Sequence, residues 1–167
     1  METEIHLLKN DLSVPLYVNN DYKLPAFANN STLVILTSYS GSTEEILSSF
    51  EDAKNKGSIV SGLTSGGELA ELLKNYSSLI FDPKHNPSQQ PRLGTGYIVV
   101  GTIALLNRMG FLNISDELFT NAVNSLKNNQ NRIKEQAIDL ANKTKGFIPI
   151  IFASEFLGGN AHILRNQ

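Results

Sequence analysis

The sequence predicts an α/β fold, a three-layer α/β/α sandwich around a parallel sheet of about four or five strands. Short apolar runs that suit buried strands alternate along the chain with stretches whose apolar residues recur at helical spacing. Twice, at residues 33–45 and 59–68, an apolar run leads through small residues directly into an acidic helix start. Such strand–turn–helix units build parallel sheets, because a parallel neighbour needs a helical crossover.

Each strand is expected where a short apolar run stops at turn-forming residues. Five runs fit this description: residues 14–18, 33–36, 59–63, 79–81 and 147–153. Helical spacing of apolar residues predicts helices at residues 4–12, 42–56, 68–73, 94–109, 116–144 and 161–165, with a possible break near residues 128–129. The stretch 82–92 holds three prolines and is expected to be a loop.

The last predicted strand, residues 147–153, suggests a domain boundary. It follows roughly thirty helical residues, which is late for a neighbour in the same small sheet. We therefore expect a first domain over residues 1–145, and the opening strand and helix start of an incomplete second domain over residues 146–167.

The composition is that of an ordinary globular protein, with 41% hydrophobic and 18% charged residues among 167. A formal net charge of −2 argues against nucleic acid or an anionic membrane as partner. The chain has no cysteine, no apolar run near the roughly 20 residues that span a bilayer, and no signal-peptide pattern, so a cytoplasmic location is expected. Three scattered histidines and the lack of a Gly-x-x-x-x-Gly-Lys motif predict no metal and no cofactor.

The loop at residues 37–45, Thr-Ser-Tyr-Ser-Gly-Ser-Thr-Glu-Glu, is the strongest functional signal. A helix N-terminus has unpaired backbone N–H groups and a partial positive charge, and hydroxyls around it can donate to phosphate oxygens. The alternative is helix capping, with Ser42 or Ser40 as N-cap and Glu44 or Glu45 closing a capping box. Capping accounts for one hydroxyl rather than four in six residues. The loop thus predicts a phosphate site made of Ser38, Ser40, Gly41, Ser42 and Thr43.

The same loop resembles the phosphosugar-binding loop of the SIS (sugar isomerase) superfamily. Three further stretches resemble segments of the bifunctional phosphoglucose/phosphomannose isomerases: Asp21-Tyr22-Lys23-Leu24-Pro25, Gln90-Pro91-Arg92-Leu93-Gly94, and residues 148–167 with Ser154-Glu155-Phe156-Leu157 and Arg165-Asn166-Gln167. The loop alone indicates the superfamily. The four stretches together, in the right order over nearly the whole chain, indicate this family.

The resemblance implies a SIS-type, flavodoxin-like fold and interconversion of fructose 6-phosphate with glucose 6-phosphate or mannose 6-phosphate through a cis-enediol. It implies that Ser38, Ser40 and Thr43 bind the substrate phosphate, with Ser42 where the family varies, and that Arg92 is catalytic. In the resembling enzymes this arginine faces the reacting carbons, where a fixed cation stabilises an enediolate. It also implies a homodimer.

The chain departs from the family at both ends. Members are about twice as long, begin with a strand and a Gly-Gly-Ser loop that this chain lacks, and place their catalytic glutamate, histidine and lysine beyond the stretch that matches Gln167. We therefore expect that the 167 residues alone do not catalyse isomerisation. A non-catalytic sugar-phosphate sensor and a purely structural fragment are the alternative hypotheses.

Other candidates carry weaker signals. The run Ser65-Gly66-Gly67 lines the same pocket or simply makes a tight strand-to-helix turn, and the second interpretation is favoured. His85 lies close to Arg92 in sequence, but a single loop histidine is more often solvated. Glu155 belongs to the Ser-Glu-Phe-Leu stretch and is interpreted as structural.

Overall fold

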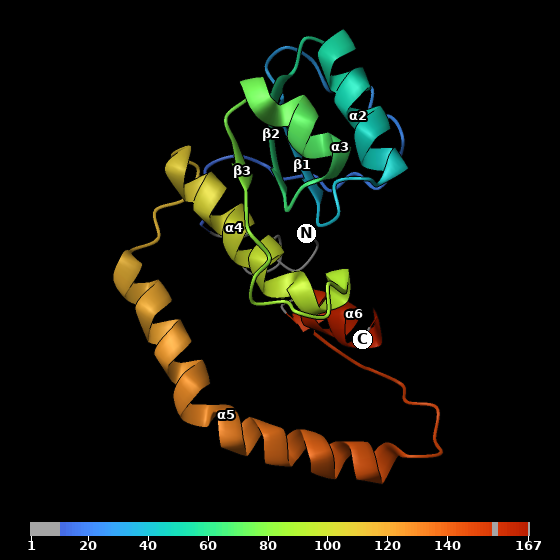
Figure 1. The fold of residues 1–167 in the computed structure, drawn as a ribbon, viewed down its shortest axis with the longest axis vertical. Coiled ribbons are helices and arrows are strands. Elements are labelled where there is room, and N and C mark those ends of the chain that lie inside the picture. The colour runs from blue at the N-terminus through green and yellow to red at the C-terminus, as the bar shows by residue number, and fades with distance from the viewer. Residues whose placement is uncertain (1–10, 155–156, 167) are drawn as a thin grey trace.

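The computed structural model describes residues 11–154 and 157–166. Over these ranges short strands alternate with helices as far as α4, and two further helices follow (Figure 1). The elements are β1 (Leu33–Ser38), α2 (Glu44–Asn55), β2 (Ile59–Thr64), α3 (Gly67–Leu72), η1 (Leu73–Asn75), β3 (Ser78–Ile80), η2 (Pro91–Gly94), α4 (Thr95–Arg108), α5 (Asp116–Thr144) and α6 (Gly158–Asn166).

The sheet is parallel, in the order β1-β2-β3. Leu33 is opposite Ile59 and Ser38 is opposite Thr64, so β1 and β2 end at the same edge. The predicted strands at 33–36, 59–63 and 79–81 are confirmed, and so is the α/β class with a parallel sheet. The expectation of four or five strands is wrong for the described residues, which contain three.

Two helices cover one face of this sheet. Val34 and Leu36 point to this face and are buried with Phe50 of α2 and Leu69 of α3. The two strand residues are two positions apart because alternate side chains of a strand point to the same face. The complete cluster of buried residues is Val34, Leu36, Phe50, Ala53, Val60, Leu69 and Leu73.

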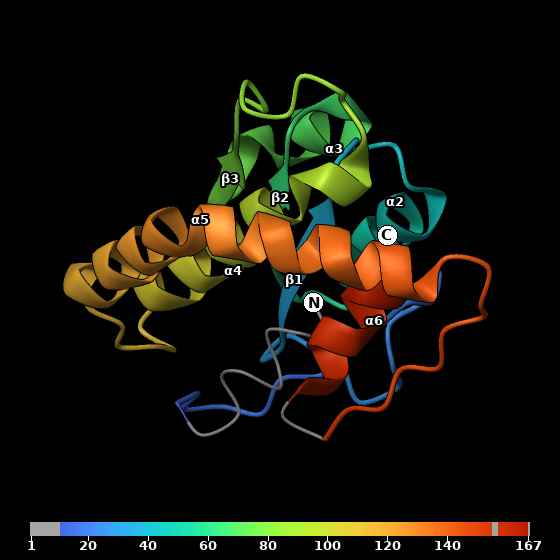
Figure 2. The same ribbon diagram turned by 90° about the horizontal axis from the view of Figure 1, so that it is seen from below.

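Helix α4 covers the opposite face and completes the three layers (Figure 1, Figure 2). Ile35 lies between Val34 and Leu36 in β1, so its side chain points to this opposite face. There it packs against the cluster of Leu106 and Leu112. Gly101 allows α4 to approach β2 closely, because a Cβ there would lie 2.8 Å from Leu63 Cδ1. The sandwich architecture predicted from the sequence is therefore present around a narrower sheet.

Two predicted strands do not form. Residues 14–18 and 147–153 have no strand pairing in the structure. Pro15 removes one backbone donor from the first segment. In the second, Ile148 and Phe152 are 93% and 90% exposed, so no strand or helix among the described residues covers these two side chains. A segment of strand-forming residues becomes a strand only where a neighbouring strand makes backbone hydrogen bonds with it.

The predicted helices agree with the structure better than the predicted strands do. Helices α2, α4 and α5 match the predictions within two residues, and α6 begins three residues before the predicted position. The possible break at residues 128–129 is absent, since α5 is continuous, although Figure 1 shows a bend part way along it. Of the helix predicted at 4–12, residues 4–10 lie outside the described residues, and residues 11–12 are not helical.

Helix α5 lies apart from the sheet and its two helical layers (Figure 1), and none of its residues is buried. It begins regularly: the Ser115 side chain accepts a hydrogen bond from the Leu118 N–H, and Asp116 and Glu117 occupy the first turn, where acidic groups favour the helix dipole. Its exposed apolar side chains are Leu118, Val123, Leu126, Ile133, Ile138 and Leu140.

Candidate functional site

The turn between β1 and α2 is closed by hydroxyl groups. Ser38, the last residue of β1, is buried, and its Oγ lies 2.7 Å from Thr43 Oγ1. The same Oγ accepts a hydrogen bond from the Gly41 N–H at 3.0 Å. Ser40 Oγ accepts one from the Ser42 N–H at 3.3 Å. These bonds hold residues 38–43, which we call the hydroxyl loop, as a compact ring at the carboxyl edge of the sheet.

The hydroxyls do not cap helix α2. Its N-cap residue is Thr43, and no side chain accepts a capping hydrogen bond there. The alternative of Ser42 or Ser40 as N-cap with a capping box is therefore wrong, because Thr43 holds the N-cap position and its hydroxyl bonds to Ser38 rather than to a backbone N–H of the helix. The first turn of α2 keeps N–H groups directed towards the loop without a side-chain cap, which is the arrangement that binds anions.

The turn after β2 packs directly against the hydroxyl loop. Gly41 has φ +71°, and a Cβ on it would lie 1.8 Å from the Gly66 carbonyl oxygen. Gly67 has φ +67°, and its Cβ would lie 2.3 Å from the Ser40 carbonyl oxygen. The Leu69 N–H donates to the Gly41 carbonyl at 2.9 Å. Residues 65–67 thus make a tight strand-to-helix turn that supports the backbone of the hydroxyl loop.

The loop after β3 contacts the hydroxyl loop at Gly94. A Cβ on Gly94 would lie 2.1 Å from Tyr39 Cε2, so the Tyr39 ring rests directly on this glycine. Arg92, two residues earlier in η2, is exposed, and its carbonyl accepts the Thr95 hydroxyl at 2.8 Å. The structure therefore brings the turn that carries Arg92 next to the hydroxyl loop, as a site at this sheet edge requires.

The predicted candidate His85 lies on the surface of the loop that leads to Arg92. Its side chain is exposed, and its backbone N–H donates to the Tyr97 hydroxyl at 3.0 Å. Glu155 lies outside the described residues. Over residues 11–154 and 157–166, no group of three or more His, Cys, Asp or Glu side chains could hold a metal ion. In the same ranges no helix is long and apolar enough to cross a membrane.

Three residues near the site were not singled out from the sequence, although Tyr22 and Tyr39 lie inside stretches that were. Tyr39 and Asn86 share a hydrogen bond of 2.7 Å between the Asn86 amide and the Tyr39 hydroxyl. Tyr22 lies close to the start of α2: the negative charge of Glu45 raises the pKa of Tyr22, and burial and Glu44 add to this rise. Glu45 is thus engaged with Tyr22, which belongs to the segment before β1.

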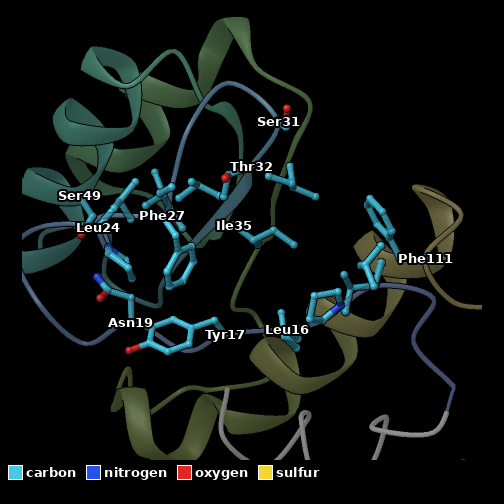
Figure 3. A pocket seen from close by; sticks show the side chains of 18 of the residues that line it. Leu16, Tyr17, Asn19, Leu24, Phe27, Ser31, Thr32, Ile35, Ser49 and Phe111 are labelled. Carbon is cyan, nitrogen blue, oxygen red and sulfur yellow. The ribbon is translucent and has the colours of Figure 1, made fainter.

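A separate cavity of about 460 Å³ lies beside β1, away from the hydroxyl loop. Figure 3 shows Leu16 and Tyr17 on one side of it and Thr32 and Ile35 across from them. Residues of α2 and the region of α4 also line it, from the two helical layers. The lining residues beyond these four are mostly apolar and include Val14, Pro15, Leu24, Phe27, Ala28, Leu33, Val34, Leu36, Ile46, Ser49, Leu106 and Phe111.

Known proteins resemble the chain over most of its length. A bifunctional phosphoglucose/phosphomannose isomerase of Caldicellulosiruptor bescii is 37% identical over 133 residues, which are 79% of this chain and 38% of the relative. The Aquifex aeolicus protein of the same name is 33% identical over 150 residues, 89% of this chain and 43% of the relative. A D-glucosamine-6-phosphate 4-epimerase of Sulfolobus acidocaldarius is 29% identical over 150 residues, 88% of this chain and 46% of the relative. No protein-family model matches. The chain spans less than half the length of these relatives.

Proposed function

Because the chain belongs to the family of bifunctional phosphoglucose/phosphomannose isomerases, we propose that its hydroxyl loop binds the phosphate of a sugar phosphate. The observation that carries this proposal is the geometry of the loop. Ser38, Gly41 and Thr43 are drawn together at the start of α2 while no side chain caps that helix. An anion placed there would be met by hydroxyls and by backbone N–H groups at the positive end of the helix.

The residues have distinct proposed roles. Ser40, Ser42 and Thr43 are exposed and available to donate to phosphate oxygens. Gly41 supplies backbone where any side chain would collide with the next turn. Ser38 is buried, so we assign it both to phosphate binding and to holding Thr43 in place.

The whole protein is proposed to interconvert fructose 6-phosphate with glucose 6-phosphate or mannose 6-phosphate. A base removes the proton beside the carbonyl, a cis-enediol forms, and the proton returns on the neighbouring carbon. Arg92 is proposed to stabilise the developing enediolate by its fixed positive charge. Its place beside the hydroxyl loop, through the Gly94–Tyr39 contact, supports this role. We assign none of the proton-transferring residues to these 167 residues, and we propose that the 167-residue chain is inactive on its own.

We further propose that residues 1–145 form a SIS-type domain whose sheet takes one more strand in the cavity beside β1, and that residues 146–167 open a second domain. The support is the position of the cavity, in the layer of the sheet and lined by residues of both helical layers. One residue of a packed strand occupies about 160 Å³, the product of the distance between strands, the rise per residue and the distance between packed layers. The cavity volume of about 460 Å³ therefore suits roughly three residues of an added strand.

A homodimer and a cytoplasmic location complete the proposal. The exposed apolar side chains of α5, among them Leu126 and Ile133, support an interface with a second copy. The alternative function is a non-catalytic sugar-phosphate sensor. It uses the same hydroxyl loop but needs no proton-transferring residues, so turnover by the whole protein separates the two.

Calorimetric titration of the chain with 5-phosphoarabinonate, a mimic of the enediolate, tests the phosphate site. We expect saturable binding that weakens tenfold or more in Thr43→Val, about 1.4 kcal/mol of binding free energy. Ser31→Ala, which removes an exposed hydroxyl before the amino end of β1, is the control and should bind as the unaltered chain does. Equal affinity of the Thr43→Val and unaltered chains would contradict the proposed site.

A further inference from the structure

Asn86 is a buried amide at the centre of the loop that leads to Arg92. Its side chain is 4% exposed, although the loop around it is largely solvent-accessible. Its Nδ2 donates to the Tyr39 hydroxyl at 2.7 Å and to the Gln90 carbonyl at 2.8 Å, while its Oδ1 accepts from the Ser88 hydroxyl at 2.7 Å. Both N–H donors are therefore used. The Gln90 carbonyl can only accept, so it fixes which end of the amide is nitrogen.

The first partner of this amide belongs to the hydroxyl loop. Tyr39 lies between Ser38 and Ser40, and its carbonyl accepts the Ser65 N–H at 3.1 Å and the Ser65 hydroxyl at 2.6 Å. Its ring lies against Gly94 and 5.6 Å from the Phe81 ring. The position of the Tyr39 hydroxyl is thus set by contacts that do not involve Asn86.

The second partner begins the turn that carries Arg92. The Gln90 carbonyl that Asn86 holds also accepts the Leu93 N–H at 3.0 Å, which closes the turn around Pro91 and Arg92. The preceding residue, Gln89, has φ +55°, in the left-handed region that costs a non-glycine residue about 1 kcal/mol. Such a conformation persists where surrounding hydrogen bonds hold it. Two such bonds are present here: the Asn86 side-chain amide donates to the Gln90 carbonyl, and the Gln89 N–H donates to the Asn86 carbonyl.

We propose that Asn86 is a positioning residue that sets the Arg92 turn against the hydroxyl loop, and so fixes the distance between substrate phosphate and arginine. The proposal rests on the proposed function in taking Arg92 as the group that faces the sugar. Asn86 itself does not touch substrate in this account. It acts through two hydrogen bonds from one nitrogen, and no smaller or purely accepting side chain can replace them.

Amide hydrogen exchange of the ligand-free chain tests the positioning directly. Tyr39→Phe removes only the hydroxyl to which Asn86 donates, and we expect it to speed exchange at Gln90 and Leu93 at least threefold. Asn86→Ala should do the same, and the double variant should add little to either. Unchanged exchange in residues 90–94 of both single variants would overturn the proposal.

Binding separates an effect on Arg92 from an effect on the phosphate site. Inorganic phosphate needs only the hydroxyl loop, whereas 5-phosphoarabinonate also needs Arg92. Asn86→Ala should weaken the second ligand tenfold or more, leave inorganic phosphate within about twofold, and have no further effect when Arg92→Ala is present. Weakening of both ligands by the same factor would overturn the proposal and indicate a general structural role.

A matched control is available in Asn107, whose amide holds another loop by donating to the Ile114 carbonyl and accepting its N–H. Asn107→Ala should lower stability without changing either affinity. If the unaltered chain binds neither ligand, the proposed function fails, and the exchange experiment on Tyr39→Phe still decides whether Asn86 positions the turn.

Discussion

Gly41→Ala should destabilise the protein far more than alanine at another left-handed glycine. At Gly41 the φ of +71° alone costs alanine about 1–2 kcal/mol. The new Cβ would also lie 1.8 Å from the Gly66 carbonyl oxygen. Since carbon–oxygen contacts settle near 3.3 Å, the two turns must separate by about 1.5 Å. That movement breaks the bond from the Leu69 N–H to the Gly41 carbonyl, worth roughly 1 kcal/mol. These two contributions add to about 2–3 kcal/mol, and the packing lost as the turns separate adds to them, so we expect a total loss of about 3–5 kcal/mol.

Gly57→Ala is the matched comparison. Its φ of +67° carries the same backbone cost, but the nearest atom to the new Cβ is Asn30 Cβ at 3.8 Å, an ordinary contact. Urea unfolding followed by circular dichroism should therefore give a loss of only about 1–2 kcal/mol for this variant. If Gly41→Ala loses no more stability than Gly57→Ala, the close packing of the hydroxyl loop on the second turn is refuted.

Three further outcomes are expected. Thr102→Val should raise the free energy of unfolding by about 1 kcal/mol, because the buried Thr102 hydroxyl has no hydrogen-bond partner; a loss of stability in urea unfolding would contradict this. The raised pKa of Tyr22 favours its neutral form in the folded state, so the contribution of Tyr22 to stability is present below pH 10.0 and is lost as the pH rises through the folded pKa. Ultraviolet titration should show that the pKa of Tyr22 falls in Glu45→Gln, and an unchanged pKa would count against the contact between Tyr22 and Glu45. Sedimentation equilibrium should show a dimer that Leu126→Lys shifts to monomer, whereas an unaltered chain that is monomeric at every concentration would exclude the α5 interface.

Local sequence pattern predicted the elements whose partners lie nearby. The run Leu33–Ser38 leads into α2, and the two parallel neighbours that follow are built from the same strand–turn–helix unit. Residues 14–18 and 147–153 have equally good strand composition, but neither segment forms a strand in the part of the chain that the structure describes. Strand formation depends on a partner backbone, and no pattern within a segment reveals whether that partner exists.

The site divides in the same way. That Ser38, Gly41 and Thr43 lie together was predictable, because a strand, a hydroxyl-rich turn and a helix start are adjacent in sequence. The capping alternative is wrong because Thr43, rather than Ser42 or Ser40, is the N-cap residue, and its hydroxyl bonds to Ser38 instead of to a backbone N–H of the helix. Asn86 could not be predicted, since its importance arises from a contact with Tyr39, 47 residues away. A buried amide in a proline-rich loop looks, in sequence, like any turn residue.

The most direct test of the phosphate site is a titration of the isotope-labelled chain with glucose 6-phosphate, followed through its backbone amide resonances. We predict saturable shifts concentrated in the amides of residues 41–45, with glucose, which has no phosphate, leaving them in place. Shifts confined to other residues, or equal shifts with glucose, would contradict the assignment of the hydroxyl loop as the phosphate site.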